Sequence, residues 1–388
     1  MTKLTLITTS TLLGCMLITG PLLTHNDTPH TNPDIIKPAA NPKIQAAILL
    51  DVSGSMNGLI DQAKAQLWNM VSVMGRVKCA NGNPAIEIAL YEYGRTSNDQ
   101  KEGYIKQISP FTSDLDKLSA KLFELSTNGG DEYCGQVIYK SLKELSWDTA
   151  SGNYKVIFIA GNEDFLQGSI HYNQACKEAG RKGVIVNTIY CGPRERGIAE
   201  HWNLGGECGQ GSFTNIDHNA KIEEMPTPYD SVLFALNDGL NKTYVYFGSQ
   251  GADAKKEQER MDVANKLQST SAGLKRINVK GKSNLYYNSH WDLVDALKAD
   301  STILTKLDKK TLPESLKNKS TSELKQFVSY NAAERTRIQQ EIAEVSIKRE
   351  NYIATEKTKT TISNNATLET EVERIIRQQV KQFNMEVQ

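Results

Sequence analysis

Residues 47–64 read AILLDVSGSMNGLIDQAK, and this stretch decides the fold. An unbroken apolar run ends at Asp51, which is typical of a strand that is buried on both faces of a sheet. The apolar residues after Ser53 and Ser55 are spaced by three and four, which predicts an amphipathic helix: Leu59, Ile60, Ala63, Leu67, Met70, Val71 and Met74. A buried strand that leads directly into a helix indicates an α/β fold.

The alternation of strands and helices continues to residue 217. Five further runs predict strands, at 85–94, 104–109, 154–161, 183–192 and 211–217. Helical spacing between these runs predicts helices at 115–125, 132–145 and 173–181. This order implies a doubly wound, mostly parallel, Rossmann-like sheet with helices on both faces. The run at 104–109 is shorter and more polar than the others, so we expect it at an edge of the sheet.

The chain has 388 residues, which favours two domains or one domain with a long appendage. We divide it into a signal peptide or membrane anchor (1–24), a linker rich in Pro and Asn (25–43), an α/β domain (44–220) and a mainly α-helical C-terminal region (221–388). Two segments of the last region carry apolar stripes at helical spacing, and we expect their helices to pack on one another or on the α/β domain. A partner-binding or coiled-coil role for them is the alternative.

The N-terminus has the pattern of a secretory signal, because Lys3 is followed by an apolar stretch of roughly 20 residues. The tetrapeptide LLGC ends at Cys15, so lipidation of Cys15 is one outcome. Ordinary cleavage is the second, and an uncleaved anchor is the third, since about 20 apolar residues just span a bilayer. All three predict an exported protein, periplasmic or anchored in the cell envelope, that meets the membrane only through this segment.

The charge balance and the motifs exclude several classes of function. Lys and Arg together number 45, as do Asp and Glu, so nothing favours a nucleic acid as partner. The sequence has no HExxH zinc motif, no P-loop and no GxSxG nucleophile motif, and its six His residues show no spacing typical of a catalytic triad. We therefore expect a protein that is not an enzyme.

Five cysteines lie beyond the leader: Cys79, Cys134, Cys176, Cys191 and Cys208. Export permits disulfides, and the odd number leaves at least one thiol free or intermolecular. No CxxC pair and no Cys/His spacing predicts a zinc site. The sequence does not fix the connectivity. The pairing that we favour joins Cys191 to Cys208, because both are expected to follow strands at the same end of the sheet.

Asp51, Ser53 and Ser55 are candidate metal ligands. The carboxyl ends of the strands in an open parallel sheet face a crevice in which ligands bind. Carboxylate and hydroxyl oxygens are hard ligands, which suit Mg²⁺ first, with Ca²⁺ or Mn²⁺ as alternatives, and which do not favour zinc. The alternative explanation is that Asp51 and Ser53 only cap the following helix.

The string DVSGSM after an apolar strand resembles the metal-ion-dependent adhesion site of von Willebrand factor type A (VWA) domains. The resemblance covers about Lys43 to Asp217. The whole chain, with its strings GGDEYCG, FIAGNE, VNTIYCG and WDLVDA, also resembles a group of exported bacterial proteins that carry such a domain. The family site has two further ligands, a Thr and an Asp. Here Asp131 matches the position of the Thr, and Gly161 matches the position of the Asp.

The resemblance implies a divalent metal site in which Asp131 supplies the negative charge that is lost at Gly161. The predicted ligands are Asp51, Ser53, Ser55 and Asp131, with water-mediated or outer contacts from Asn162, Glu163 and Asp164. In the family, an acidic residue of a partner protein completes the coordination of the metal. The resemblance thus implies a protein-binding module of the cell envelope. The alternative is a scaffold without metal, whose C-terminal helices mediate oligomerisation or assembly.

Overall fold

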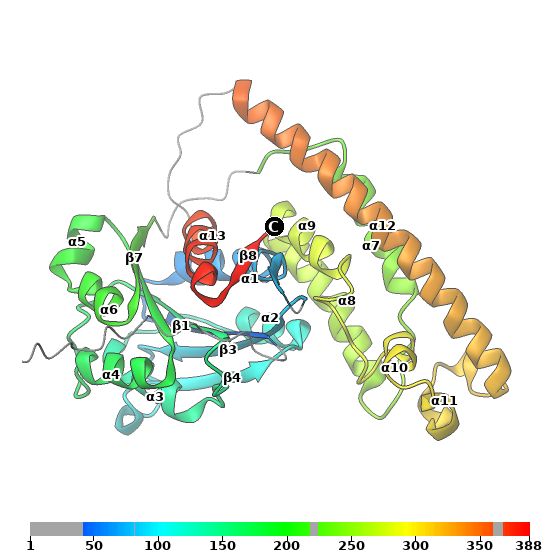
Figure 1. Ribbon diagram of the computed structural model, residues 1–388, viewed down its shortest axis with the longest axis horizontal. Helices are drawn as coiled ribbons and strands as arrows, with labels where there is room; N and C mark the ends of the chain where they lie inside the picture. Colours follow the sequence, from blue (N-terminus) through cyan, green and yellow to red (C-terminus); the bar gives the residue numbers. More distant parts are fainter. Residues whose placement is uncertain (1–41, 81, 218–223, 360–367) are drawn as a thin grey trace, which may run out of the picture. The chain divides into compact units, whose positions relative to one another are not determined.

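A six-stranded sheet is built by strands that lie between residues 43 and 216 (Figure 1). The computed structural model describes residues 42–80, 82–217, 224–359 and 368–388. The strands of this sheet are β1 (Lys43–Asp51), β3 (Ala85–Tyr93), β4 (Lys106–Thr112), β5 (Tyr154–Gly161), β6 (Ile185–Cys191) and β7 (Gln210–Ile216). Strand β4 pairs antiparallel with β3 at one edge, and the other pairings are parallel. This confirms the predicted doubly wound, mostly parallel sheet.

The strand order places the end of β1 at the switch point of the sheet. The order is β4-β3-β1-β5-β6-β7, so the chain builds one side of the sheet from β1 and then crosses to the other side at β5. Ligands of open α/β sheets bind outside the carboxyl ends of the strands at such a point. Asp51 is the last residue of β1 and lies opposite Tyr93 of β3.

Residues 46–50 of β1 are all apolar because the strand separates two hydrophobic cores. Ile44, Ile48 and Leu50 belong to one core cluster, and Ala47 and Leu49 belong to the other. Side chains of a strand alternate between its faces, so an unbroken apolar run fits a strand that is covered on both.

Helices cover both faces of the sheet. The first core cluster contains apolar residues of α1 (Asn57–Met74) and α2 (Leu115–Phe123). The second contains residues of α3 (Cys134–Glu144), α4 (Tyr172–Lys182) and α6 (Trp202–Cys208). Two short elements lie in the connections of the sheet domain, η1 (Gln100–Glu102) and α5 (Arg194–Ala199).

The segment from residue 224 to residue 359 is helical, as predicted for the C-terminal region. Its elements are α7 (Asp230–Lys242), α8 (Gly251–Gln268), α9 (Thr270–Lys280), α10 (Leu293–Ala299), α11 (Ile303–Lys306), η2 (Lys309–Thr311), η3 (Glu314–Leu316) and α12 (Thr321–Lys359). The apolar stripe that the sequence shows within 334–353 belongs to α12, which is 39 residues long.

The C-terminal end of the chain returns to the sheet (Figure 1). Helix α13 (Leu368–Gln379) is followed by η4 (Val380–Phe383) and by β8 (Met385–Val387), which pairs antiparallel with β2 (Val77–Cys79). Gln379 donates to Asn187 Oδ1 of β6 at 2.7 Å and accepts from the Tyr154 hydroxyl of β5 at 2.8 Å. These contacts place α13 on the sheet, which is one of the two arrangements expected for the C-terminal helices.

A buried ionic cluster joins the helical segment to the sheet domain, and we call it the Arg276 network. Arg276 of α9 is fully buried and donates to Asp116 of α2 at 2.5 Å and to Asp262 of α8 at 2.6 Å. Trp68 of α1 donates its indole N–H to Asn265 of α8 at 2.8 Å. Buried polar groups, which pair with one another and not with water, therefore specify how the helical segment packs on α1 and α2.

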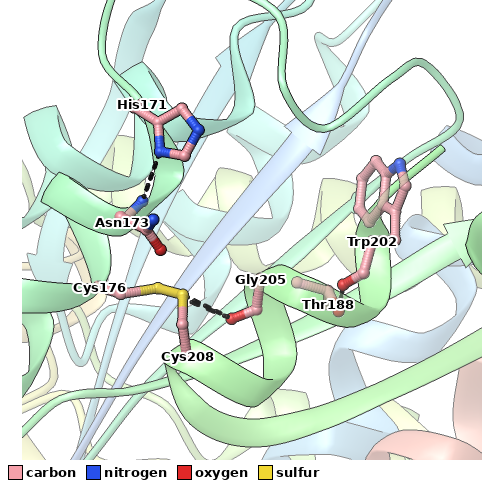
Figure 2. Close-up of a disulfide and its surroundings, with 7 residues drawn as sticks. All are labelled: His171, Asn173, Cys176, Thr188, Trp202, Gly205 and Cys208. Carbon is pink, nitrogen blue, oxygen red and sulfur yellow. Dashed lines mark hydrogen bonds between the residues drawn. A yellow bond between two sulfur atoms is a disulfide. The ribbon is translucent and has the colours of Figure 1, made fainter.

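The disulfide joins Cys176 of α4 to Cys208 of α6, with their Cα atoms 5.7 Å apart (Figure 2). The favoured pairing of Cys191 with Cys208 is therefore wrong. Cys191 is the last residue of β6 and is buried in the first core cluster, whereas Cys208 is the last residue of α6, a helix on the other face of the sheet. Cys79, Cys134 and Cys191 are free thiols.

The predicted leader, including Cys15, lies outside the described residues, and so does nearly all of the predicted linker. None of the helices in the described ranges is both long enough and apolar enough to cross a membrane.

Candidate metal site at the carboxyl end of the sheet

The DVSGS turn is fixed by hydrogen bonds at the tip of β1. The backbone N–H of Ser53 donates to Asp51 Oδ1 at 2.7 Å, a local turn that Asp favours. The backbone N–H of Val52 donates to the carbonyl of Tyr93 at 2.9 Å, which ties the turn to β3. Helix α1 has Met56 at its N-cap position, and no side chain in the described part of the chain caps it. Asp51 and Ser53 therefore do not cap α1 with their side chains, as the alternative explanation required.

The tip of β5 meets the two serines. The hydroxyl oxygens of Ser53 and Ser55 lie 3.5 Å apart. Asn162, the residue after β5, donates its side-chain amide to Ser55 Oγ at 3.3 Å. Ser53 is buried and Ser55 is exposed, so the pair leads from the interior to the surface. The structure thus brings together Asp51, Ser53, Ser55 and Asn162 from two neighbouring strand ends.

Two buried oxygen atoms of this cluster have no partner. Asp51 is fully buried, and within the described residues its Oδ2 atom accepts no hydrogen bond. The same holds for Asn162 Oδ1. Leaving a buried acceptor unpaired costs about 1–3 kcal/mol, and more when the group is charged. A divalent cation would satisfy such oxygens, and the donor set of carboxylate, amide carbonyl and hydroxyl oxygens fits Mg²⁺ or Ca²⁺.

Carboxylates alone do not make this site. Among the described residues, no three side chains of His, Cys, Asp or Glu are grouped so that they could hold a metal ion. A cation bound here would depend on the hydroxyls of Ser53 and Ser55 and on Asn162, together with Asp51. The amide contact of Asn162 with Ser55 is compatible with the outer role that the sequence predicts for Asn162.

Gly161 has no room for a side chain. A Cβ atom at this position would lie 2.6 Å from the hydroxyl oxygen of Tyr93 and 2.9 Å from Asp51 Oδ2. The Tyr93 hydroxyl is held in place because it donates to the carbonyl of Ala160 at 2.9 Å. The carboxylate that the resemblance places at position 161 is therefore excluded by a tyrosine of β3, which lies on the other side of β1.

A buried carboxyl group beside Asp51 comes from Glu132, which is not among the ligands that the sequence predicts. Asp131 is exposed, and its carboxylate accepts from the Tyr133 hydroxyl at 3.1 Å. Glu132 is only 6 % exposed. A Cβ atom on Gly94, which has a φ of +82°, would lie 2.9 Å from Glu132 Cγ and 3.1 Å from Asp51 Oδ1. The sequence signal was present as two consecutive acids, but the loop turns the second one inward.

Burial and mutual repulsion make the carboxyl groups of the cluster weak acids. Burial raises the pKa of Asp51 to about 6, although the nearby backbone N–H groups of Ser53 and Asn162 favour its charged form. Burial also raises the pKa of Glu132 to about 8, with further contributions from the charges of Asp51 and Glu163. A divalent cation would relieve this repulsion.

The remaining predicted residues shape the loop after β5. The backbone carbonyl of Glu163 accepts from the indole N–H of Trp202 at 2.7 Å. Asp164 contacts His201 Nδ1 at 3.1 Å and accepts from the backbone N–H of Leu166 at 2.9 Å. Glu163 therefore adds negative charge to the cluster, whereas the Asp164 carboxylate is engaged by its own loop and by His201.

Replacing Glu132 with glutamine is expected to flatten the pH dependence of stability of the metal-free protein. Between the usual Glu pKa of 4.5 and about 8, the folded protein keeps a proton on Glu132 that the unfolded chain has released. The free energy of unfolding therefore falls as the pH rises through this window, by up to about 1.4 kcal/mol per pH unit. Glutamine removes this contribution. Urea unfolding in EDTA across the window measures the slope.

Glu124→Gln is the control for Glu132→Gln, because the Glu124 side chain is 58 % exposed. The control should keep the slope of the wild type. An unchanged slope in Glu132→Gln would show that this carboxyl group does not exchange its proton on unfolding.

Comparisons with known proteins bear on the fold alone. No protein-family model and no curated protein matches the sequence. The VWA domain of SpRpn10 is 16% identical over 45% of this chain and 88% of that chain, with a TM-score of 0.34. An aerotolerance-related membrane protein from Bacteroides fragilis is 17% identical over 45% and 93%, with a TM-score of 0.31. A von Willebrand factor type A structure from Catenulispora acidiphila is 15% identical over 45% and 39%, with a TM-score of 0.33.

Proposed function

We propose that the carboxyl-end edge of this VWA-like sheet holds a divalent cation and binds a partner protein through it. The observation that carries the proposal is the pair of unpaired, buried oxygens, Asp51 Oδ2 and Asn162 Oδ1, beside two hydroxyls. Mg²⁺ is the cation that we expect, with Ca²⁺ and Mn²⁺ as alternatives.

Each residue of the cluster has a part in this proposal. Asp51 supplies charge from the interior, and the Ser53 N–H holds its other oxygen. Ser53 and Ser55 offer hydroxyl oxygens, and Asn162 keeps Ser55 in position through its amide. A bound cation supplies a positive centre to which oxygen atoms of a partner can bind. Ser55 is exposed, so the partner would reach the cation on that side.

The extra carboxylates influence which partner groups bind well. Glu132 and Glu163 both act on the charge of the cluster, and Asp131 lies at its exposed rim. They lower the residual positive charge of a bound cation. We therefore propose tight cation binding with a weaker attraction for an acidic residue of the partner than the family resemblance implies.

We also propose that the protein is exported and that it is not an enzyme. The disulfide between Cys176 and Cys208 supports an oxidising compartment, because cytosolic proteins rarely keep disulfides. The serine turn does not match the GxSxG nucleophile motif, and we therefore propose a binding role and not hydrolysis.

Mg²⁺ is expected to stabilise the wild type and not the Asp51→Asn variant. A ligand at about 100 times its Kd adds about 2.7 kcal/mol to the free energy of unfolding. Asp51→Asn keeps the shape of the side chain but removes its charge, so most of this gain should be lost. Urea unfolding with Mg²⁺, Ca²⁺ or Mn²⁺ and with EDTA measures the gain.

Asp164→Asn is the matched control, because Asp164 lies on the same edge and contacts His201. It should respond to Mg²⁺ like the wild type. If none of the three cations changes the stability of the wild type, the site does not bind metal. That result would favour the alternative of a scaffold without metal. Because the alternative predicts oligomerisation through the C-terminal helices, the oligomeric state of the full chain would test it. A pull-down of the full chain with and without EDTA, repeated with Asp51→Asn, tests partner binding.

A further inference from the structure

The loop after β5 belongs to the candidate metal site, and residues at the start of α6 hold it in place. The indole N–H of Trp202 donates to the carbonyl of Glu163 at 2.7 Å. The backbone N–H of Phe165 donates to the carbonyl of Glu200 at 2.9 Å. Residues 162–171, all of which the structure describes, contain neither a helix nor a strand. The position of this loop therefore depends on its contacts with α6 and with the residues just before α6.

Trp202 is itself fixed to the sheet, so it connects the loop to a rigid part of the molecule. Its side chain is fully buried. Its backbone carbonyl accepts from the hydroxyl of Thr188 on β6 at 2.7 Å (Figure 2). Its ring packs against Phe165 of the loop and Tyr190 of β6, with ring centroids 5.1 Å and 5.9 Å apart. The start of α6 is thus a bridge between β6 and the loop of the candidate site.

Helix α6 is too weak to hold this position alone. It has seven residues, and two of them are glycines. Helices shorter than about 12 residues are marginal in water, and each Gly costs about 1 kcal/mol relative to Ala. Packing requires both glycines, because a Cβ on Gly205 would collide with the ring of Phe165, and one on Gly206 would lie 2.9 Å from the backbone nitrogen of Phe213. Close packing on the loop therefore weakens the helix itself.

The disulfide fastens the other end of α6. Cys208, the last residue of α6, is bonded to Cys176 of α4 (Figure 2). Helix α4 is a firm anchor, because it has 11 residues and buries Ala175 and Ala179 in the second core cluster. Cys208 is half-buried, whereas Cys176 is only 8 % exposed. Cys208 is therefore the more accessible residue of the pair.

We propose that the disulfide between Cys176 and Cys208 is a redox switch of the cation site. The bond keeps α6 docked and the loop after β5 in place, and its reduction releases both and weakens cation binding. This inference rests on the proposed function, because it assigns a regulation to the same site.

A dithiol is the class of reductant that the switch requires. One thiolate of the dithiol attacks the sulfur of Cys208, the S–S bond breaks, and Cys176 leaves as a thiolate that takes up a proton. The second thiol then attacks the sulfur of the reductant in the mixed disulfide and releases Cys208, which is protonated in the same way. The protein gains two electrons and two protons, and the dithiol is oxidised to a disulfide.

The switch acts by local unfolding, which leaves the sheet intact. Without the bond, α6 loses its link to α4, and Trp202 then releases the loop. Asn162 lies in this loop and donates to Ser55 Oγ at 3.3 Å, so the hydroxyl of Ser55 loses its support. A disulfide with only a structural role would stabilise the whole fold and would leave the cation affinity of the folded protein unchanged.

The test compares the oxidised full chain with the chain reduced by dithiothreitol, in buffer without denaturant. Calorimetry measures the affinity for Mg²⁺, and hydrogen exchange measures the opening of residues 162–166 and of α6. We expect reduction to weaken Mg²⁺ binding by about tenfold, within the usual range of coupling between two sites. Exchange should become faster in residues 162–166 and in α6 but not in β1. The amide of Phe165 is the most direct probe, because it donates to Glu200.

Variants of the cysteines assign the effect to this bond. The double variant Cys176→Ala and Cys208→Ala should behave like the reduced wild type and should not respond to dithiothreitol. Cys79→Ser removes a free, partly exposed thiol and should respond like the wild type. Equal Mg²⁺ affinity of the oxidised and reduced chains, or unchanged exchange of residues 162–166 on reduction, would overturn the switch.

Trp202→Phe keeps the test decisive if the double variant does not fold. It retains an aromatic ring but removes the N–H that donates to Glu163, so exchange of residues 162–166 should be faster even in the oxidised chain. Trp147→Phe is the matched control, because the indole of Trp147 donates to the carbonyl of Ser141 on α3 and not to this loop. Equal loop exchange in the two variants would contradict the role of Trp202.

Failure of the cation site is distinguishable from failure of the switch. If the oxidised chain bound no Mg²⁺, the proposed function would be wrong. The exchange of residues 162–166 would still decide whether the disulfide controls the loop, because that measurement needs no cation.

Discussion

Replacing Arg276 with methionine is expected to lower the free energy of unfolding by about 3–5 kcal/mol. The guanidinium is fully buried and bonds to Asp116 at 2.5 Å and to Asp262 at 2.6 Å. These carboxylates hold the pKa of Arg276 above its usual range, and the charges of Arg276 and Lys280 hold the pKa of Asp262 below its usual range. Methionine fills much of the same volume but leaves the carboxylates buried without their cation.

The effect should include loosening of the helical segment from the sheet domain. Arg276 lies on α9, Asp116 lies on α2, and the guanidinium also stacks 4.6 Å from the ring centroid of Trp68 on α1. One residue thus joins both parts through charge and through packing. Hydrogen exchange of α8 and α9, measured together with urea unfolding, should show faster opening in Arg276→Met than in the wild type.

Arg337→Met is the matched control for Arg276→Met. Arg337 forms ion pairs with Glu334 and Glu341 on α12, but its side chain is 54 % exposed. Exposed pairs contribute about 0–1 kcal/mol, because water and mobile ions screen them. If Arg276→Met cost no more than Arg337→Met, the Arg276 network would not stabilise the docked helices.

Removing the disulfide is the change with the second-largest expected effect. The bond closes a loop between positions 32 residues apart. Loop closure of this length restricts the unfolded chain by about 3–4 kcal/mol. The double variant Cys176→Ala and Cys208→Ala should therefore lose about this amount of unfolding free energy relative to the oxidised wild type. Urea unfolding of the protein purified from an oxidising compartment measures it.

Two measurements check the origin of this loss. A reducing agent should destabilise the wild type but have no effect on the double variant. Cys79→Ser removes a free and partly exposed thiol, so it should stay close to the wild type. If the reducing agent had no effect on the wild type, Cys176 and Cys208 would not be joined in the folded protein.

The sequence determined the sheet because strand burial has a local signature. The run that ends at Asp51 is apolar at every position that faces either core, so a strand covered on both sides follows from composition and period alone. The same reasoning placed the polar run at 104–109 at the edge, where β4 lies. It also located Asp51, Ser53 and Ser55, because one short turn carries all three.

Only the tertiary structure decided which other side chains reach this turn. Asp131 and Glu132 are adjacent acids, and the backbone of their loop determines which one is buried beside Asp51. The partner of Cys208 depends on the distance between α4 and α6, which no sequence spacing encodes. The return of α13 to the sheet depends on contacts of Gln379 with two strands that are distant in the chain, at separations of 192 residues from Asn187 and 225 residues from Tyr154. The local spacing of apolar residues determines the helices and strands, but long-range packing determines which of them lie next to each other.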